Sequence, residues 1–280
     1  MTLQNVAPTS HTFVANADRS EGNESRTSAP GVQVAADQPP PLHRYAEHWP
    51  SITVVIPTLN EAENLPHVLP QIPAWVDEVL LVDGHSTDST VAVARELRPD
   101  IRIIYQQGRG KGAALRTGFA AAAGDIIVML DADGSTDPGE IPAFIGALLS
   151  GADFAKGSRF LQGGGTADMP LYRKLGNFSF VLSVRMLFGG NYSDLCYGYN
   201  AFWRHVVPRL KLDGDGFEIE TMMNIRALRA QLKIAEVPSF EAPRVYGIGR
   251  LRTIPDGWRV LKTIIREWLT PHTERLDEGA

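Results

Sequence analysis

The stretch "DIIVMLDADGSTDP", residues 125–138, places two carboxylates directly after a run of apolar side chains. The run 126–130 contains no polar residue, which is typical of a strand buried on both faces of a parallel sheet. Asp131 and Asp133 follow it, and the residues from Gly134 onward predict a turn. Taken alone, the two acids fit either a ligand site at a strand end or a turn that caps a helix. The residues that the rest of the chain brings beside them decide between the two.

Strand-like and helix-like segments alternate on both sides of this stretch. The segments that resemble strands are 52–57, 78–84, 101–106, 126–131, 153–160 and 232–240. The segments with a helical pattern are 60–75, which prolines interrupt, and 88–98, 110–124, 139–151, 166–190, 217–231 and 257–269. This alternation predicts an α/β fold, with a mostly parallel sheet covered by helices on both faces. The stretch 194–204 is rich in aromatic residues and is assigned no element.

The first 48 residues differ in composition from the rest. Residues 1–48 are rich in Ser, Thr, Asn, Ala and Pro and show no hydrophobic periodicity. Such a segment buries too little apolar surface to offset the entropy lost on ordering, so we expect a disordered leader. A short targeting or docking arm is the alternative. Residues 49–280 are expected to form a single domain that ends in an amphipathic helix.

Composition and charge exclude several classes of protein. The chain has 280 residues, 44% of them hydrophobic, and a net charge of −5, which argues against a nucleic-acid-binding protein. Its single cysteine, Cys196, excludes an internal disulfide framework and a cysteine-rich zinc site. We find neither a signal peptide nor a transmembrane segment in the sequence. A cytoplasmic protein is expected, with any membrane contact peripheral, and a homo-oligomer is left open.

Acidic residues follow three of the predicted strands. Glu61 lies just past the first strand, Asp83 ends the second, and Asp131 and Asp133 follow the strand of the opening stretch. Because the carboxyl ends of parallel strands meet at one edge of a sheet, these acids are expected to share one polar site.

The stretch "QGRGKGAAL", residues 107–115, adds a candidate phosphate-binding element. Its glycines allow close approach of the backbone, Arg109 and Lys111 carry positive charge, and a helix follows. The spacing is not that of a P-loop, because Gly112 stands where a Ser or Thr is required. A structural turn before a helix is an equally good interpretation of this stretch alone.

Read together, these segments resemble the family-2 inverting glycosyltransferases with the GT-A fold. The similarity is greatest to the branch with dolichol- and polyprenyl-phosphate mannosyl- and glucosyltransferases, and it runs from about residue 51 to about residue 253. The segments that carry it, in the family's order, are "VVIPTLNE", "LLVDGHSTDST", "GRGKGAALRTGFAAAAGDIIVMLDADGS", "AKGSRF", "YRKLGN", "SDLCYGYNAFWR", "GDGFEIET" and "IAEVPSFEAPRVYGIGRL". The resemblance implies a Rossmann-like nucleotide-diphospho-sugar transferase fold and a hexosyltransferase that uses a UDP- or GDP-sugar.

The resemblance also implies a role for individual residues. Asp133 would bind Mg²⁺ or Mn²⁺, and Asp131 would hold the sugar or ribose. Hard divalent ions prefer oxygen ligands, and a carboxylate with diphosphate oxygens is a usual magnesium site. The residues that would bind the nucleotide sugar are Pro57, Thr58, Glu61, Asp83, Lys111, Gly112 and Asp131.

On the acceptor side, the resemblance implies a set of residues that face a lipid phosphate. They are Arg159, Arg173, Asn177 and Arg250. Planar, permanently charged Arg suits phosphate binding. The residues implied for catalysis are Asp131, Asp133, Arg159 and Glu220, with Glu220 either a base or a structural acid. His85 is interpreted as a loop histidine near the nucleotide.

Several positions depart from the family's pattern. The family's second adjacent acid is here Gly84, an arginine is replaced by Asn200, and a glutamine near the metal is replaced by Ser135. The family's last motif, Arg-x-x-Gly-x-Ser-Lys, runs here from Arg244 to Arg250. Arg250 keeps the positive charge at its end, but Gly249 replaces the serine, so the hydroxyl is lost. These departures fall more heavily on the acceptor side than on the donor side.

The nature of the acceptor is the main open question. A polyprenyl phosphate is already an anion, whereas a hydroxyl of a glycan or metabolite needs a base, for which Asp215, Glu218 and Glu220 are candidates. The segments 178–188 and 258–269 could meet a lipid surface, or simply pack against the protein. We predict a polyprenyl-phosphate acceptor. Two competing hypotheses are a nucleotidyltransferase and a nucleotide-sugar-binding protein without activity.

Overall fold

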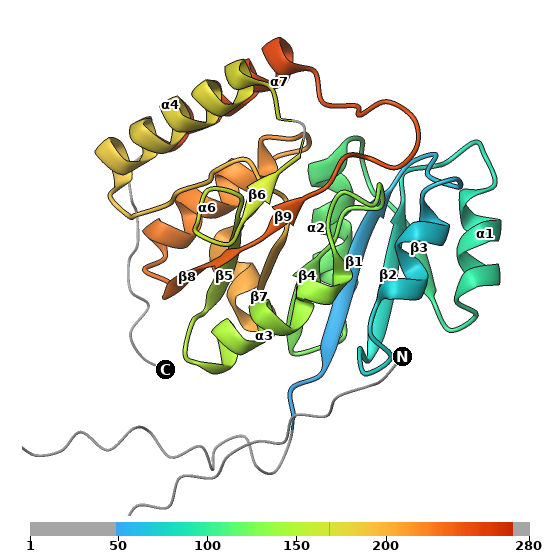
Figure 1. Ribbon diagram of the computed structural model, residues 1–280. Helices are drawn as coiled ribbons and strands as arrows, with labels where there is room; N and C mark the ends of the chain where they lie inside the picture. Colours follow the sequence, from blue (N-terminus) through green and yellow to red (C-terminus); the bar gives the residue numbers. More distant parts are fainter. Residues whose placement is uncertain (1–48, 168, 271–280) are drawn as a thin grey trace, which may run out of the picture. The chain divides into compact units, whose positions relative to one another are not determined.

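A seven-stranded sheet forms the centre of the computed structural model, which describes residues 49–167 and 169–270 (Figure 1). The strand order is β3-β2-β1-β4-β7-β5-β8, and all neighbouring pairs are parallel except those that involve β7. The strands are β1 (Ile52–Thr58), β2 (Glu78–Asp83), β3 (Arg102–Tyr105), β4 (Ile126–Met129), β5 (Phe154–Ser158), β7 (Asn200–Trp203) and β8 (Ile234–Pro238). The expected mostly parallel sheet is confirmed. The leader expected over residues 1–48 lies outside the described residues.

Strand β7 lies within the aromatic-rich stretch that was assigned no element. It is inserted antiparallel between β4 and β5. Its Phe202 is fully buried, stacks on Phe154 and meets the edge of Phe119. Because β7 runs against its neighbours, it begins at the edge where the other strands end. The chain just before Asn200 is thereby brought to that edge.

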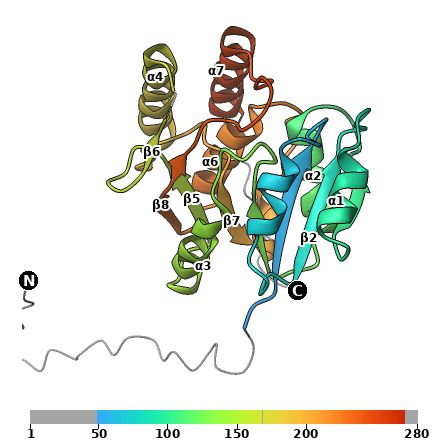
Figure 2. The same ribbon diagram turned by 45° about the vertical axis from the view of Figure 1, so that its right-hand side comes forward.

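Helices cover both faces of the sheet (Figure 2). Side chains alternate between the two faces of a strand, so Val54 and Ile56 of β1 pack on one side and Val55 on the other. The first side carries α3 (Ile141–Leu149) and the second carries α2 (Lys111–Ala121) and α6 (Ile219–Arg229). The remaining helices over the sheet are α1 (Thr90–Leu97), α5 (Val207–Leu210), η2 (Leu65–His67), η3 (Leu69–Gln71), η4 (Pro138–Glu140) and η5 (Arg204–Val206).

The stretch 60–75 does not form the expected helix. It contains the two short 3-10 helices η2 and η3. Proline lacks an N–H group and clashes with the preceding turn, so Pro66 and Pro70 prevent a continuous helix. Leu65 and Leu69 are still buried on the sheet, which is why the segment shows helical spacing of apolar residues.

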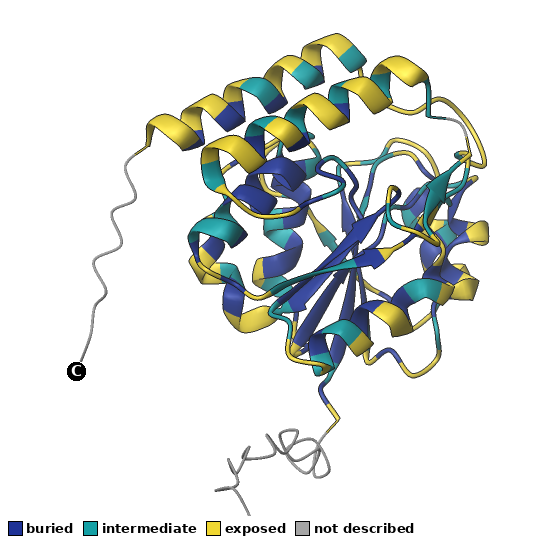
Figure 3. Ribbon diagram, turned by 60° about the vertical axis from the view of Figure 1, so that its left-hand side comes forward, coloured by how far each residue is buried: buried dark blue, intermediate teal, exposed yellow. Residues whose placement is uncertain are grey.

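Two long helices, α4 (Leu171–Phe188) and α7 (Thr253–Leu269), lie side by side beyond the carboxyl edge of the sheet (Figures 1 and 3). They pack on each other and on α6 through a small apolar cluster that includes Val184 and Ile264. Their outer faces leave large apolar side chains exposed. This α4–α7 platform consists of Leu171, Tyr172, Leu175, Phe178, Leu182, Met186, Leu187, Ile254, Trp258, Ile265, Trp268 and Leu269.

A small second sheet, β6 (Gly165–Thr166) and β9 (Phe240–Glu241), completes the described part of the chain. Across residues 49–270, Asp168 excepted, every helix is too short or too polar to span a bilayer.

Candidate active site

The predicted acidic residues lie at one edge of the sheet. Thr58 ends β1 directly beside Asp83 at the end of β2, and β4 on the other side of β1 leads into Asp131 and Asp133. Pro57 precedes Thr58 on β1, in register with Val82 of β2. The strand-end acids are therefore brought together, as the parallel topology requires.

Lys111 joins two of the acids in a compact cluster. Its Nζ atom lies 2.7 Å from Asp131 Oδ1 and 2.9 Å from Glu220 Oε1. Burial raises the pKa of Glu220 above its usual range, although Lys111 opposes this rise. Burial alone would lower the pKa of Lys111, but Asp131 and Glu220 together raise it above its ordinary value. Glu220 thus holds the ammonium group that faces Asp131.

The first N–H groups of α2 do not face an open phosphate site. Gly112 N–H donates to the carbonyl of Asp215 at 2.8 Å, and Ala113 N–H reaches the same oxygen at 3.3 Å. A Cβ on Gly112 would lie 2.4 Å from the carbonyl oxygen of Gly214, so only glycine allows this approach. Gly112 was expected to flank the base and diphosphate of the nucleotide sugar, and in the structure its N–H group is already bonded to Asp215. The structure gives Gly112 a packing role, which leaves Lys111 facing the site.

Asp133 lies just beyond the end of β4, and its side chain is 25% exposed. Its Oδ1 atom accepts hydrogen bonds from the N–H (3.0 Å) and the hydroxyl (2.7 Å) of Ser135. Its Oδ2 atom lies 3.4 Å from Nη1 of Arg244. Arg244 also forms an ion pair with Glu61, so one guanidinium bridges two residues expected to serve the donor.

The loop that carries Arg244 lies across this edge. Val245 N–H donates to the carbonyl of Asp133 at 3.1 Å, and Tyr246 N–H donates to Asn64 Oδ1 at 2.8 Å. Further along, Nη2 of Arg250 donates to the carbonyl of Leu59 at 2.8 Å. Arg250 was expected on the acceptor side, but this contact places it next to the end of β1.

One carboxylate oxygen of Asp83 accepts a hydrogen bond within the described residues, and the other does not. Its Oδ2 atom accepts a hydrogen bond from Ser86 N–H at 2.9 Å. Its Oδ1 atom is buried and has no hydrogen-bond partner among the described residues. Buried acceptors in folded proteins are nearly always paired, so this oxygen calls for a donor on a ligand. His85, two residues on, is exposed and stacks on Tyr105 with ring centroids 5.6 Å apart.

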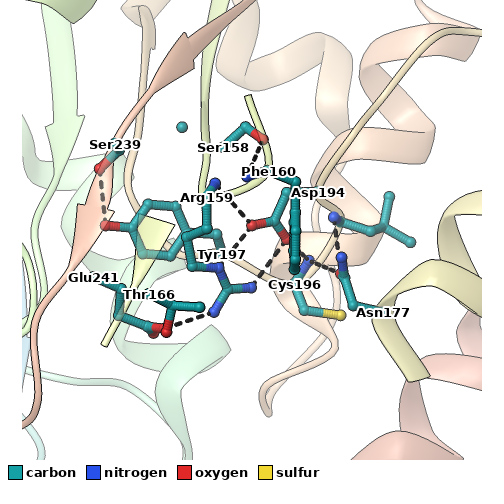
Figure 4. Close-up of polar contacts among 12 residues, drawn as sticks. Ser158, Arg159, Phe160, Thr166, Asn177, Asp194, Cys196, Tyr197, Ser239 and Glu241 are labelled. Carbon is teal, nitrogen blue, oxygen red and sulfur yellow. Dashed lines mark hydrogen bonds and ion pairs between the residues drawn. The ribbon is translucent and has the colours of Figure 1, made fainter. Parts of the chain in front are cut away.

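Arg159 is committed to other side chains (Figure 4). Its Nε and Nη2 atoms donate to Asp194 at 2.7 and 3.0 Å, and Nη1 donates to Glu241 at 3.0 Å. Burial would raise the pKa of Asp194, but Arg159 holds it below its usual range. The guanidinium expected to bind the acceptor phosphate is therefore occupied, because a buried carboxylate satisfies it as well as a phosphate would.

Asn177 likewise supports the backbone. Its Oδ1 atom accepts hydrogen bonds from the N–H groups of Leu195 (3.1 Å) and Cys196 (3.2 Å). Arg173 lies at the start of α4 and donates from Nε to the hydroxyl of Thr253 at 3.2 Å, where α7 begins. The residues expected on the acceptor side are thus separated: Arg159 and Asn177 position the segment 194–197, and Arg173 lies at the junction of the platform helices.

Residues 53–210 match the family model described as Glycosyl transferase family 2. The chain belongs to glycosyltransferase family 2. This glycosyltransferase is 32% identical over 216 residues to polyprenol monophosphomannose synthase of Mycolicibacterium smegmatis, covering 71% of the chain and 80% of that relative. It is also 32% identical over 210 residues to dolichol-phosphate mannosyltransferase of Pyrococcus furiosus, covering 72% of the chain but only 59% of that relative.

Solved structures show that the fold of this glycosyltransferase is GT-A. Glucosyl-3-phosphoglycerate synthase from Mycobacterium tuberculosis, in complex with Mn²⁺, UDP and glucosyl-3-phosphoglycerate, superimposes with a TM-score of 0.63 at 23% sequence identity. The match covers 79% of this chain and 81% of that one. At this identity the similarity establishes the fold alone.

The residues of this glycosyltransferase suit a metal ion that arrives with its substrate. No three His, Cys, Asp or Glu side chains converge into a ready-made metal site within residues 49–167 and 169–270. The Asp133 side chain is 25% exposed, with Oδ1 in contact with Ser135 and Oδ2 near Arg244, and magnesium is commonly held by one or two carboxylates plus substrate phosphates. Asp133 would therefore be the residue that holds the ion, together with phosphate oxygens of a substrate.

Two contacts of the candidate site were not predicted from the sequence. The pairing of Lys111 with Glu220 joins segments far apart in the chain, and no local pattern announces it. Arg244 was noted only as the start of the last motif, yet it contacts Glu61 and Asp133. The signal that could have found it is an isolated arginine that opens a Gly-containing loop near the end of the segments resembling the family.

Proposed function

We propose that this glycosyltransferase moves a hexose from a nucleoside-diphosphate sugar to a polyprenyl phosphate with the help of Mg²⁺ or Mn²⁺. Relatives named for dolichol-phosphate and polyprenol-phosphate mannose transfer support this acceptor class. A structural neighbour crystallised with Mn²⁺ and UDP supports a metal and a nucleotide. The observation that carries the proposal is the set of contacts made by the three residues that could act as a general base.

A hydroxyl acceptor needs a carboxylate that can take its proton. Glu220 is buried against Lys111, and Asp215 forms an ion pair with Arg116. Glu218 Oε1 accepts hydrogen bonds from the N–H groups of Asp215 (3.2 Å) and Gly216 (2.9 Å). Glu220 and Asp215 are thus tied to cations, and Glu218 is tied to backbone through Oε1, while its Oε2 atom is buried without a partner among the described residues. A phosphate acceptor is already an anion and needs no base, so it fits this site better.

The α4–α7 platform supports a lipid acceptor. Its two helices lie beyond the carboxyl edge of the sheet (Figures 1 and 3). Their exposed side chains are bulky and apolar, and Asp131 and Asp133 follow β4 at that edge. Arg259, Lys262 and Arg266 lie along the same helix as Trp258, and Lys262 Nζ is 5.6 Å from the centroid of a Trp258 ring. Apolar side chains flanked by cations favour binding to an anionic membrane surface.

In the proposed reaction, an oxygen of the acceptor phosphate attacks the anomeric carbon of the sugar. The bond from that carbon to the diphosphate oxygen breaks, and its electron pair leaves with the nucleoside diphosphate. Asp131 would orient the sugar or ribose, with its carboxylate held by Lys111, and Arg173 would face the acceptor. When bound at Asp133, the divalent ion supplies charge neutralisation for the departing diphosphate.

The test compares two acceptors that differ only in the phosphate. The purified protein is incubated with Mn²⁺, radiolabelled UDP- and GDP-hexoses and either a polyprenyl phosphate or the matching polyprenol. We expect label in the organic phase only with the phosphate. Equal labelling of the polyprenol would favour a hydroxyl acceptor. Failure to bind or transfer from any nucleotide sugar would overturn the donor site itself.

Replacing Trp258 and Trp268 with Ser is expected to weaken binding to vesicles of anionic phospholipid by roughly tenfold. Both side chains are 55% exposed on the platform, and burying apolar area contributes about 25 cal/mol per Å². Co-flotation with the vesicles measures the effect. Trp75→Ser is the matched control, since Trp75 is 46% exposed but precedes β2 at the opposite edge of the sheet. Equal flotation of all three proteins would contradict membrane docking through the platform.

A further inference from the structure

The chain between β9 and α7 crosses the carboxyl edge of the sheet (Figure 1). We call residues 242–250 of this segment the strap. The N–H group of Val245 donates to the carbonyl of Asp133 at 3.1 Å, and Nη2 of Arg250 donates to the carbonyl of Leu59 at 2.8 Å. The strap is therefore attached both to the chain that follows β4 and to the chain that follows β1.

A glycine lets the strap lie directly against the segment that carries Asp133. Gly134 has a φ of 79°, and a Cβ atom on it would lie 2.6 Å from Cγ2 of Val245. Tyr246 is also fixed, because its N–H group donates to Oδ1 of Asn64 at 2.8 Å and its carbonyl accepts from Nδ2 of Asn64 at 3.2 Å. Residues 247–249 are exposed and include two glycines, which gives the backbone freedom next to these fixed residues.

Arg244 of the strap places a cation between two carboxylates of the candidate site. Its Nη1 atom lies 3.4 Å from Oδ2 of Asp133, and its Nη2 atom forms an ion pair with Glu61. Glu61 is buried, and a buried carboxylate is costly unless a cation or hydrogen-bond donors satisfy it. In the protein without its donor, Arg244 thus supplies positive charge to the edge where a metal ion would be needed.

The contact with Arg244 competes with a metal ion for one carboxylate oxygen. Oδ1 of Asp133 already accepts two hydrogen bonds from Ser135, which leaves Oδ2, and this oxygen faces Arg244. The side chains of Arg244 and Asp133 are only 18% and 25% exposed, so solvent screens charges between them incompletely. A divalent ion at Oδ2 would be repelled by the guanidinium beside it. Metal binding and the contact between Arg244 and Asp133 therefore disfavour each other.

We propose that Arg244 occupies the place of the divalent ion until the donor arrives, and that the ion must displace it from Asp133. This inference rests on the proposed function, which assigns the ion to Asp133. Arg244 is a positioning residue in this role, because it acts on the ion through the carboxylate. Coupling between two binding events is reciprocal. Removing the guanidinium should therefore tighten binding of the ion, and the ion should loosen the strap.

The first experiment titrates the protein with Mn²⁺ in the absence of nucleotide and follows free Mn²⁺ by electron paramagnetic resonance. Arg244→Gln should bind Mn²⁺ at least about fivefold more tightly than the unaltered protein, the lower end of typical coupling between sites. Arg252→Gln is the matched control, since it removes one positive charge at an exposed position just before α7. The control should bind Mn²⁺ like the unaltered protein. Circular dichroism checks that both variants are folded.

The second experiment measures hydrogen exchange in the strap and needs no variant for its main result. The N–H groups of Val245 and Tyr246 are hydrogen-bonded in the structure, so their exchange should be slow without metal. Adding Mn²⁺ alone to the unaltered protein should speed their exchange. In Arg244→Gln the exchange should already be fast, and Mn²⁺ should change it little.

The possible results separate this inference from the proposed function. If Arg244→Gln binds Mn²⁺ no more tightly than the unaltered protein, or if Mn²⁺ leaves the exchange of residues 245 and 246 unchanged, Arg244 does not hold the place of the ion. The proposed function would still stand if Mn²⁺ binds in the presence of UDP or GDP. Failure of the unaltered protein to bind Mn²⁺ with either nucleotide would remove the ion from Asp133 and overturn both proposals.

Discussion

Replacing Asp133 with Ala is expected to lower the turnover of sugar transfer by roughly 10³-fold or more. The carboxylate is the proposed protein ligand of the divalent ion, and an ion in this position contributes several kcal/mol, at about 1.4 kcal/mol per factor of ten. The measurement is the initial rate of label transfer to polyprenyl phosphate at saturating Mn²⁺. Binding of Mn²⁺ in the presence of UDP or GDP, followed by electron paramagnetic resonance, should weaken in parallel.

The control for this variant is Asp100→Ala. Asp100 is a largely exposed carboxylate that precedes β3, at the opposite edge of the sheet, and forms an ion pair with Arg98. Its removal should leave both the rate and Mn²⁺ binding unchanged. Circular dichroism checks that Asp133→Ala is folded, because Asp133 also holds Ser135 and contacts Arg244. Retained turnover in a folded Asp133→Ala protein would contradict the metal role.

Replacing Asp194 with Asn is expected to lower the free energy of unfolding by about 3–5 kcal/mol. Asp194 is fully buried and accepts two hydrogen bonds from the guanidinium of Arg159 (Figure 4). Removing the carboxylate charge leaves a buried cation that only Glu241 still pairs within the described residues. Urea unfolding at pH 7 measures the loss.

The pH dependence provides a second readout for Asp194. Its pKa is lower in the folded protein than its ordinary value of 3.8, so the stability that it contributes is present above that value and is lost as pH falls further. The Asp194→Asn protein should lack this acid-dependent part. Adding Arg159→Met should restore some stability, because both charges are then absent. A loss below about 1 kcal/mol would mean that the pair is not buried as described.

Most of the sheet could be predicted because its strands are continuous apolar runs. The strands β1, β2 and β4 carry buried side chains on both faces, and each run ends where a polar residue begins. Strand β7 was not predicted, because it has only four residues, begins with Asn200 and pairs with strands that are distant in the sequence. Local patterns therefore identified the strands that are hydrophobic by themselves and missed the one that depends on its partners.

The candidate site divides in the same way. The placement of Asp83 and Asp131 at the same edge of the sheet follows from parallel topology, since strand ends share an edge. The binding partner of Arg159 could not be predicted, because a guanidinium group binds a carboxylate and a phosphate equally well. Only the position of Asp194, brought in by a distant segment, shows which of the two it binds in the structure.

The insertion of β7 has a consequence for how the nascent chain must fold. Strand β5 has only β7 and β8 as neighbours within the described sheet, and both are synthesised after it. Until residues 200–203 leave the ribosome, β4 presents an open edge and β5 has no strand to pair with. Strands β1 to β4 can assemble early, but the sheet becomes continuous only when β7, which is synthesised later, is inserted between β4 and β5. The N-terminal half alone is therefore exposed to edge-to-edge aggregation during synthesis, and the site that joins Asp131 to Glu220 of α6 forms only after this late part of the chain is made.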